Sequence, residues 1–248
     1  MNQITSPAGK PPFVGTYPQA LLAPRKHTVI FLLICCAVTA VSAMNAAGNA
    51  HPGTSPHSQN EMMQVYLFMI GMQCLWVRFI SKGMKRCERS IFEFLATKNY
   101  GPAALAKDIL FGALAFLTIY FISNGLGNLI HHDPSASAPL LPALPNGPLA
   151  VTVWIALSLS AGICEEIVFR GYLQRQLSAL TGNLALAIVL QAVIFGVAHA
   201  YEGVAAMFDI TLHGLILGLL AAWRGNIRAG MIEHAAWDII AGLGIMQI

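Results

Sequence analysis

The chain has 248 residues, of which 56% are hydrophobic and only 10% are charged, and its formal net charge is +3. Soluble globular domains carry about 25% charged residues, so this composition argues against a water-soluble enzyme. It also argues against disorder over most of the length, because so much apolar surface does not stay solvated. The net charge is too small to indicate nucleic-acid binding, and we expect no nucleic-acid partner. Cysteines in or beside apolar runs, without C-x-x-C spacing, make a disulfide scaffold unlikely.

Seven apolar runs follow one another along the chain. A helix needs about 20 apolar residues to cross the hydrocarbon core of a bilayer. The runs lie at residues 28–47, 62–80, 109–130, 149–164, 184–198, 204–223 and 229–246. The fourth continues without a break into CEEIVFRGYLQRQL, which predicts one long helix over 149–177, and every proline precedes residue 149. The sequence therefore predicts an all-α, polytopic integral membrane bundle of about seven transmembrane helices in a lipid bilayer.

The basic residues predict which side of the membrane each connector occupies. All 14 lysines and arginines lie before the first run, near the end of the second or between it and the third, after the fourth, or between the sixth and seventh. Basic residues near span ends gather on the cytoplasmic side. We therefore expect a multi-pass protein with a cytoplasmic N-terminus, and a bacterial inner membrane is the expected location.

Composition divides the chain into three parts. Residues 1–27, rich in proline, predict a disordered cytoplasmic tail, residues 28–148 an N-terminal membrane part, and residues 149–248 a Pro-free helical bundle. In the middle part, the basic segment 81–107 predicts an interfacial helix on the anionic inner leaflet, and 131–148 predict a Pro-rich outer loop. The first apolar run is interpreted as an anchor, with a cleaved signal peptide as the alternative.

Costly polar side chains recur inside the apolar helices of the Pro-free part. A charge at the centre of a membrane helix costs about 2.5–3.5 kcal/mol on insertion scales, and such a residue is functional by default. The residues are Glu165, Glu166, Arg170, His199, Asp209, His213, Glu233, His234 and Asp238. We interpret Asp209 with His213 as a structural pair, and Glu233 as a surface partner of nearby arginines. Packing alone hardly explains two adjacent carboxylates followed by an arginine on a hydrophobic helix. We therefore favour a functional role over a structural one for Glu165, Glu166 and His199.

Helical geometry separates the two adjacent glutamates. Glu166 and Arg170 share a face at i, i+4 in the favourable order, whereas Glu165 is rotated by about 100°. If the fourth and fifth helices form a hairpin at 181–183, Glu165 and His199 stand at equal depth, because each lies 17 residues from Gly182 in the turn. A carboxylate and an imidazole facing each other hold a water between them. His199 also precedes a short outer connector, which predicts a locally thin membrane or a sixth helix that begins deep in it.

Three motifs on successive helices carry a resemblance to a known family. They read Glu165-Glu166-Ile167-Val168-Phe169-Arg170, Phe195-Gly196-Val197-Ala198-His199 and His234-Ala235-Ala236-Trp237-Asp238. Together they resemble the pattern EExxxR, FxxxH and HxxxN or HxxxD of the CPBP family of intramembrane proteases. That family includes the CAAX prenyl proteases and bacteriocin-processing, Abi-like relatives. The resemblance covers about residues 149–238.

The resemblance implies an intramembrane endopeptidase whose catalytic bundle is residues 149–248. Its substrate would be a membrane-associated protein or peptide. Carried over by position, Glu165 would activate water with His199 as its partner, while Glu166 and Arg170 would support that pair.

The last motif leaves alternatives open. His234 with Asp238 would stabilise the oxyanion or orient the substrate, and Asp238 is either protonated or an acceptor that orients His234, since an ionised carboxylate does not donate. A divalent metal such as zinc is another route to an activated water. His199, His234 and either Glu165 or Asp238 would supply its ligands. Family members are commonly labelled metalloproteases, and a metal-free, glutamate-activated mechanism fits the residues equally well.

Two other function classes would use the same bundle. A non-catalytic immunity or binding protein would hold a membrane peptide or partner without cutting it. A transporter would use the buried carboxylates as a proton relay, but no helix pair shows the matching Gly/Pro interruptions of many transporters.

Overall fold

The computed structural model describes residues 20–49, 59–95, 101–129 and 144–245, which form helices and no strand. In chain order the elements are α1 (Arg25–Asn49), α2 (Gln59–Lys85), the 3₁₀ turn η1 (Ile91–Phe94), α3 (Pro102–Leu129), α4 (Pro148–Glu166), the π-helical segment η4 (Ile167–Leu173), α5 (Gln174–Thr181), α6 (Leu184–Ala198), the 3₁₀ turn η5 (Ala200–Glu202), α7 (Val204–Arg224) and α8 (Arg228–Gly242). The predicted all-α membrane bundle is confirmed.

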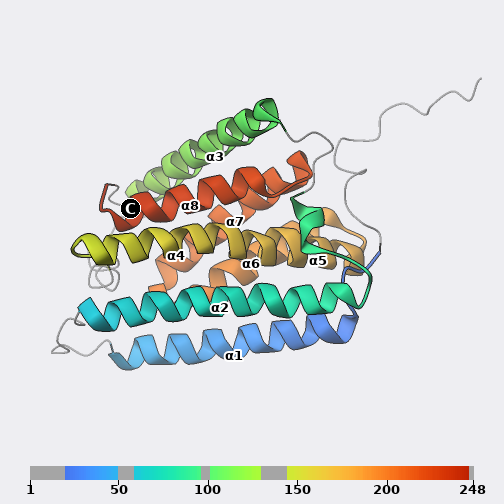
Figure 1. Ribbon diagram of the computed structural model, residues 1–248, viewed down its shortest axis with the longest axis horizontal. Helices are drawn as coiled ribbons and strands as arrows, with labels where there is room; N and C mark the ends of the chain where they lie inside the picture. The colour runs from blue at the N-terminus through green and yellow to red at the C-terminus, as the bar shows by residue number, and fades with distance from the viewer. Residues whose placement is uncertain (1–19, 50–58, 96–100, 130–143, 246–248) are drawn as a thin grey trace, which may run out of the picture.

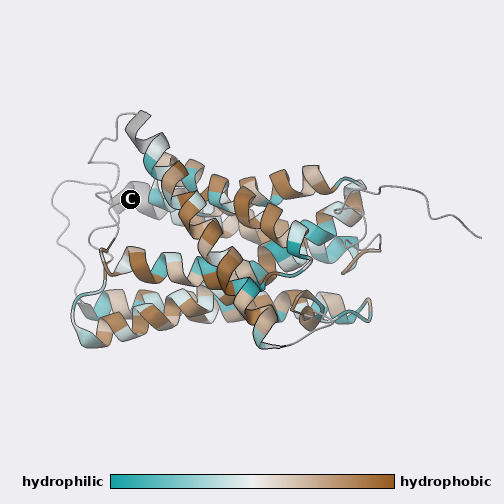
Figure 2. Ribbon diagram, turned by 90° about the horizontal axis from the view of Figure 1, so that it is seen from above, coloured by the Kyte–Doolittle hydropathy of each residue, from teal (hydrophilic) through white to brown (hydrophobic). Residues whose placement is uncertain are grey.

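The helices form two layers (Figure 1). Helices α1, α2, α4, α8 and α3 lie side by side in this order, and α6 and α7 pack together behind them. Hydrophobic ribbon extends along most of the helices in Figure 2. Large apolar side chains such as Leu33, Phe68 and Phe121 are exposed on the outside of the bundle. Such a surface suits a lipid surrounding rather than water.

Five stretches of helix are long and apolar enough to cross a membrane. They are residues 25–44, 60–85, 102–125, 148–181 and 204–224, and the fourth confirms the long helix predicted from residue 149. The other two predicted runs are also helical, but α6 and α8 have only 15 residues each. Such a helix is about 22 Å long, shorter than the roughly 30 Å hydrocarbon core. A locally thin bilayer and a helix α7 that begins deep in the membrane both accommodate this length.

Basic side chains gather at one end of the bundle. Buried Asp108, at the start of α3, pairs there with Arg224 at 2.6 Å and Arg228 at 2.5 Å, at the end of α7 and the start of α8. At the start of α1, His27 donates from Nε2 to the carbonyl of Phe79, near the end of α2, at 3.0 Å. The predicted orientation requires the basic ends of the helices to lie on one side of the membrane, and this common end meets that requirement. The orientation and the inner-membrane location stay predictions.

Residues 20–27 differ from the predicted disordered tail. Arg25 opens α1, and Leu22 and Ala23 are buried at 1% and 0% exposure. The Gln176 side chain holds them, because its Oε1 accepts from the backbone N–H groups of both residues at 2.7 and 3.2 Å. Its Nε2 donates to the Ala23 carbonyl at 2.8 Å. This buried amide orders the segment, and residues 1–19 lie outside the described part of the chain.

The basic segment 81–107 does not form the predicted interfacial helix in its described part. Its first residues complete α2, η1 is a single turn, and its last residues begin α3. Phe94 of η1 is fully buried, and a Cβ at Gly171 would come within 2.5 Å of its ring. Because Gly171 leaves room for this ring, η1 packs on the bundle. Residues 96–100, like 130–143 of the predicted outer loop, lie outside the described ranges.

The α5–α6 hairpin turns where the sequence predicts. Helix α5 ends at Thr181, and Gly182 adopts φ = 69°, a left-handed conformation that glycine reaches without steric strain. Asn183 then caps α6, since its side-chain oxygen accepts from the Leu186 N–H at 3.0 Å. The turn makes α6 return along the long helix that carries the two glutamates.

Candidate active site

Glu166 and Arg170 form the ion pair that their spacing predicts. Arg170 Nη1 donates to Glu166 Oε1 at 2.7 Å, and both side chains are fully buried. The pair lies where α4 passes into the π-helical segment η4. Such segments are rare and are frequent at functional sites. The pair therefore fixes two charges at an irregular point of the long helix.

Phe195 shows why the second motif begins with an aromatic residue. Its ring lies 4.3 Å from Cζ of Arg170, a cation–π contact inside the bundle. Nε and Nη2 of Arg170 are buried without a hydrogen-bond partner, so the ring face compensates part of their desolvation. The same ring lies 4.8 Å from the His199 ring and 5.8 Å from the His234 ring. Phe195 thus joins the three motifs, a role that sequence spacing alone does not assign.

His199 follows the last residue of α6 and has a defined tautomer. Its Nδ1–H donates to the carbonyl of Phe195 at 2.8 Å, because a carbonyl oxygen only accepts. This bond leaves the Nε2 lone pair to accept a hydrogen bond. Among the described residues no hydrogen bond joins His199 to Glu165, and their predicted facing stays a prediction.

Glu165 has different neighbours from Glu166, as the rotation between them predicts. Its Oε1 accepts from Nε2 of Gln73, on α2, at 3.2 Å. Its Oε2 lies 3.9 Å from Nε2 of His234, on α8. That oxygen is buried without a hydrogen-bond partner, although the side chain as a whole is 19% exposed, against 0% for Glu166. Oε2 of Glu166 is likewise buried without a hydrogen-bond partner, so what distinguishes Glu165 is its greater exposure and the absence of an arginine partner such as Arg170.

His234 lies among three carboxylates. Its Nδ1 is 3.3 Å from Glu166 Oε1, and since a carboxylate only accepts, Nδ1 carries the proton. Its Nε2 faces Glu165 at 3.9 Å and Asp238 Oδ2 at 3.7 Å, both beyond direct hydrogen-bond distance. Both ring nitrogens face negative groups, which suits an imidazolium with two N–H donors. Glu165, Glu166, His234 and Asp238 are thus brought together as the motifs predict.

A second acid–histidine pair lies behind these residues. His213 Nε2 of α7 is 2.8 Å from Glu233 Oε2 of α8, and both side chains are buried. The His213 ring lies 5.8 Å from that of His234. The pair therefore supports the helix that carries the third motif. Its sequence signal is a histidine in an apolar run and an acid next to the motif histidine.

Two interpretations from the sequence are wrong here. Glu233 is not a surface residue, because α8 turns it inward to His213, while the nearby arginines pair with Asp108 instead. Asp209 does not pair with His213 either. Its Oδ1 accepts from Ser123 Oγ of α3 at 2.6 Å. In both cases the true partner comes from another helix, which spacing along one helix does not reveal.

Small residues allow α8 to approach the two glutamates closely. A Cβ at Gly162 of α4 would lie 2.7 Å from the backbone nitrogen of Ala235. A Cβ at Gly230 of α8 would lie 2.8 Å from Glu166 Oε2. Glycines at such contacts let membrane helices pack backbone to backbone. This close packing is what brings His234 within reach of Glu166.

The predicted zinc ligands do not form a metal-binding cluster in this arrangement. Within the described ranges, no three His, Cys, Asp or Glu side chains are placed to hold a metal ion. Nδ1 of His234 is already bound to Glu166, and the contacts of His199 are with Phe195 and Tyr201 rather than with Glu165. The zinc alternative stays a prediction.

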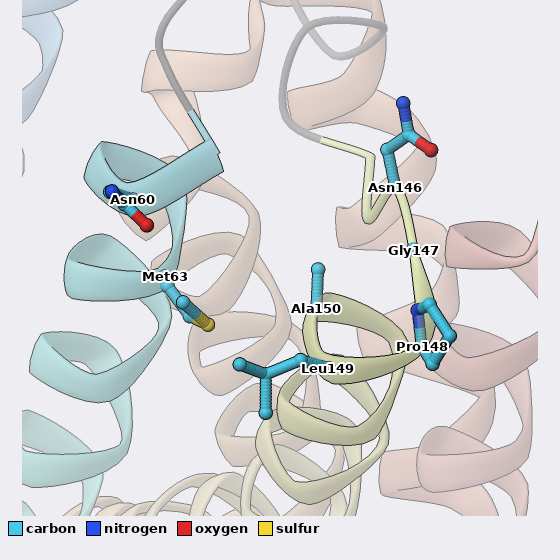
Figure 3. A pocket seen from close by; sticks show the side chains of 7 residues that line it. All are labelled: Asn60, Met63, Asn146, Gly147, Pro148, Leu149 and Ala150. Atoms are coloured by element: carbon cyan, nitrogen blue, oxygen red, sulfur yellow. The ribbon is translucent and has the colours of Figure 1, made fainter.

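A separate pocket lies between the first turns of α2 and α4 (Figure 3). It has an empty volume of about 450 Å³ and is lined by Asn60, Met63, Asn146, Gly147, Pro148, Leu149 and Ala150. Figure 3 shows Met63 and Leu149 facing each other across it. Leu149 precedes Glu165 by 16 residues, about 24 Å along a helix. The pocket is therefore remote from the carboxylates.

The comparisons with known proteins agree with the motifs. Residues 147–240 match the family model described as type II CAAX prenyl endopeptidase, Rce1-like. No curated protein and no solved structure matches the chain. The matched range contains Glu165, Phe195, His199, His234 and Asp238, whereas α1, α2 and α3 lie outside it. The match therefore supports the resemblance of this C-terminal part of the chain to the CPBP family of CAAX proteases.

Proposed function

We propose that the chain is an intramembrane endopeptidase that cuts a peptide bond of a membrane-associated protein or peptide, with Glu165 as the base that activates water. One observation carries the proposal. Gln73 holds one oxygen of Glu165, while the other is buried, has no hydrogen-bond partner and faces His234. Buried polar atoms are rarely left unpaired, because each costs about 1–3 kcal/mol. A water nucleophile supplies the missing partner.

His199 completes the water site in this proposal. The Nε2 lone pair of His199 and Oε2 of an ionised Glu165 both accept, so one water donates a hydrogen to each. As the water oxygen attacks the peptide carbonyl carbon, Glu165 takes its proton and a tetrahedral oxyanion forms. Glu165 then passes that proton to the amide nitrogen as the C–N bond breaks. The products are a carboxylic acid and an amine, and Glu165 is again ionised.

His234 is the donor that stabilises the oxyanion. An oxyanion needs hydrogen-bond donors already in place, and Nε2–H of His234 lies on the same side as the free oxygen of Glu165. Glu166 accepts from Nδ1 and so sets the orientation of the ring, and Arg170 holds Glu166 ionised. Asp238 acts as an acceptor beside Nε2. In this role Asp238 does not have to donate a hydrogen bond.

Peptide cleavage by the purified full-length chain tests the proposal. Two fluorogenic peptides serve as probes, one with a prenylated cysteine three residues before its C-terminus and one identical but unprenylated. We expect cleavage of at least one, with the bond identified by mass spectrometry, and the pair of probes distinguishes the two substrate classes. Glu165→Gln and His199→Ala should each lower kcat at least about 100-fold.

The control is Glu93→Gln, which changes an exposed carboxylate (38%) on η1 and should leave kcat unchanged. Full cleavage by both Glu165→Gln and His199→Ala would overturn the assignment. A non-catalytic immunity protein makes the opposite prediction in cells, because its phenotype would survive Glu165→Gln.

A further inference from the structure

We infer that Gln73 is a positioning residue for Glu165, supplied to the site by a helix outside the matched protease domain. The inference rests on the proposed role of Glu165 and adds a residue that the three motifs do not contain. Gln73 lies within α2 and is 7% exposed, and its Nε2 donates to Glu165 Oε1 at 3.2 Å. Its Oε1 accepts from the hydroxyl of Ser160, on α4. A chain of hydrogen bonds thus runs from Ser160 through Gln73 to Glu165.

The direction of this chain follows from the chemistry of its ends. An ionised carboxylate has no proton to donate, so the amide nitrogen of Gln73 has to face Glu165. The amide oxygen then faces Ser160, whose hydroxyl is the donor. Ser160 Oγ also lies 2.9 Å from the carbonyl of Leu157, a second acceptor on its own helix. Leu157 competes with Gln73 for the one proton of this hydroxyl, so the carboxylate of Glu165, which only accepts, sets the orientation of the amide and Ser160 supports it.

The bond from Gln73 determines which oxygen of Glu165 is free. With Oε1 bound, rotation of the carboxylate would break a hydrogen bond inside a membrane bundle. Oε2 consequently stays directed toward His234, 3.9 Å away. Among the residues that the structure describes, Gln73 is the one that donates a hydrogen bond to Glu165.

The bundle contains a matched control for this glutamine. Gln191 of α6 is 0% exposed, and its Nε2 donates to the carbonyl of Gly214, on α7, at 3.0 Å. It joins two helices as Gln73 does but does not contact Glu165. Substitution of either residue by methionine keeps the side-chain length and removes the amide. The two variants therefore differ in the loss of a donor to the base.

The test compares kcat and KM of Gln73→Met, Ser160→Ala, the double variant and Gln191→Met on the peptide probe that is cut. A hydrogen bond to a charged group is worth a factor of roughly 10 to 100 in rate. We expect Gln73→Met to lower kcat by about that factor with KM within twofold, and Ser160→Ala to lower it less. The double variant should match Gln73→Met, because Ser160 acts through Gln73. Gln191→Met should leave kcat unchanged.

An infrared difference spectrum between the chain and its Glu165→Gln variant gives a readout that needs no turnover. We expect Gln73→Met to shift the Glu165 carboxylate bands and Gln191→Met to leave them in place. Unchanged bands, or full kcat in Gln73→Met, would overturn this inference alone. Full activity of Glu165→Gln would instead overturn the proposed function, so the two failures are distinguishable.

Discussion

Two groups of ionisable side chains share the same helices and differ in their exposure and in the distances to their partners. In the closed group, Glu166 bonds Arg170 at 2.7 Å and Glu233 bonds His213 at 2.8 Å, all of them buried. In the open group, Glu165 and Asp238 are 19% and 29% exposed and lie 3.9 and 3.7 Å from Nε2 of His234. His234 belongs to both, because its Nδ1 is bound by Glu166.

The difference separates a scaffold from a reaction site. A closed pair in a low-dielectric interior holds its geometry, since breaking it leaves an uncompensated charge. An open group keeps an oxygen and a ring nitrogen available for a water and for a developing oxyanion. Charge within the membrane therefore marks both groups, and greater exposure with longer contacts marks the one that we assign to chemistry.

The largest expected loss of stability comes from a substitution in the closed group. Glu166→Ala leaves Arg170 buried without its partner and should lower the free energy of unfolding by about 3–5 kcal/mol. Unfolding in mixed micelles with increasing SDS measures this change. Glu165→Ala is the matched comparison, and we expect it to abolish cleavage with less than about 1 kcal/mol of destabilisation. Equal destabilisation by both would remove the distinction between the groups.

A smaller loss is expected from Phe195→Leu. The substitution removes the cation–π contact with Arg170 and should cost about 2 kcal/mol, the value for a desolvated pair. If Phe195 stabilises chiefly through the guanidinium, Phe195→Leu should cost much less in an Arg170→Met background. A double-mutant cycle measures this coupling, and additive effects would contradict it.

Gly230→Ala tests whether the closed group sets the geometry of the open one. The new methyl would lie 2.8 Å from Glu166 Oε2, so the carboxylate has to move. We expect a cost of about 1–3 kcal/mol in stability, typical of overpacking, together with a lower kcat because His234 loses its orientation. Gly71→Ala is the control, since a Cβ at Gly71 meets no atom within 4 Å. An undiminished kcat in Gly230→Ala would show that the two groups act independently.

The smallest change in kcat is expected from a conservative substitution of Asp238, in the open group. Asp238→Asn keeps an oxygen acceptor beside His234 and should change kcat less than about tenfold, whereas Asp238→Ala should reduce it further. Cleavage rates on one peptide probe compare the two. A loss of activity in Asp238→Asn as severe as in Asp238→Ala would require the negative charge of Asp238.

Chelation addresses the metal alternative for the same open group. Activity that survives exhaustive chelation, with no metal found by elemental analysis, is the expected result for a water activated by Glu165. A stoichiometric metal that leaves together with activity would instead assign His199 and His234 as ligands.

Some features were predictable because they depend on short stretches of chain. The Glu166–Arg170 pair needs only the four-residue helical repeat, and the hairpin at Gly182 needs only the ends of two apolar runs. The role of Gln73 was not predictable, because it depends on α2 approaching α4 across 92 residues of sequence. Glu233 was misplaced since proximity along α8 does not show which face meets a neighbouring helix.

The segment Ile167–Leu173 restricts how the sequence is able to change in length. A π-helical turn closes its hydrogen bonds one residue further along than an α-helical turn, so it behaves as an insertion held within the helix. Deleting one residue within the segment would restore an ordinary helix with both halves close to their present directions, whereas deleting one residue of α4 before it would rotate everything beyond by about 100°. Gln174 would then turn away from the Gly218 carbonyl and Gln176 from the backbone of Leu22. The irregular turn keeps both halves of one helix in register with different partners, and the glutamates stand immediately before it.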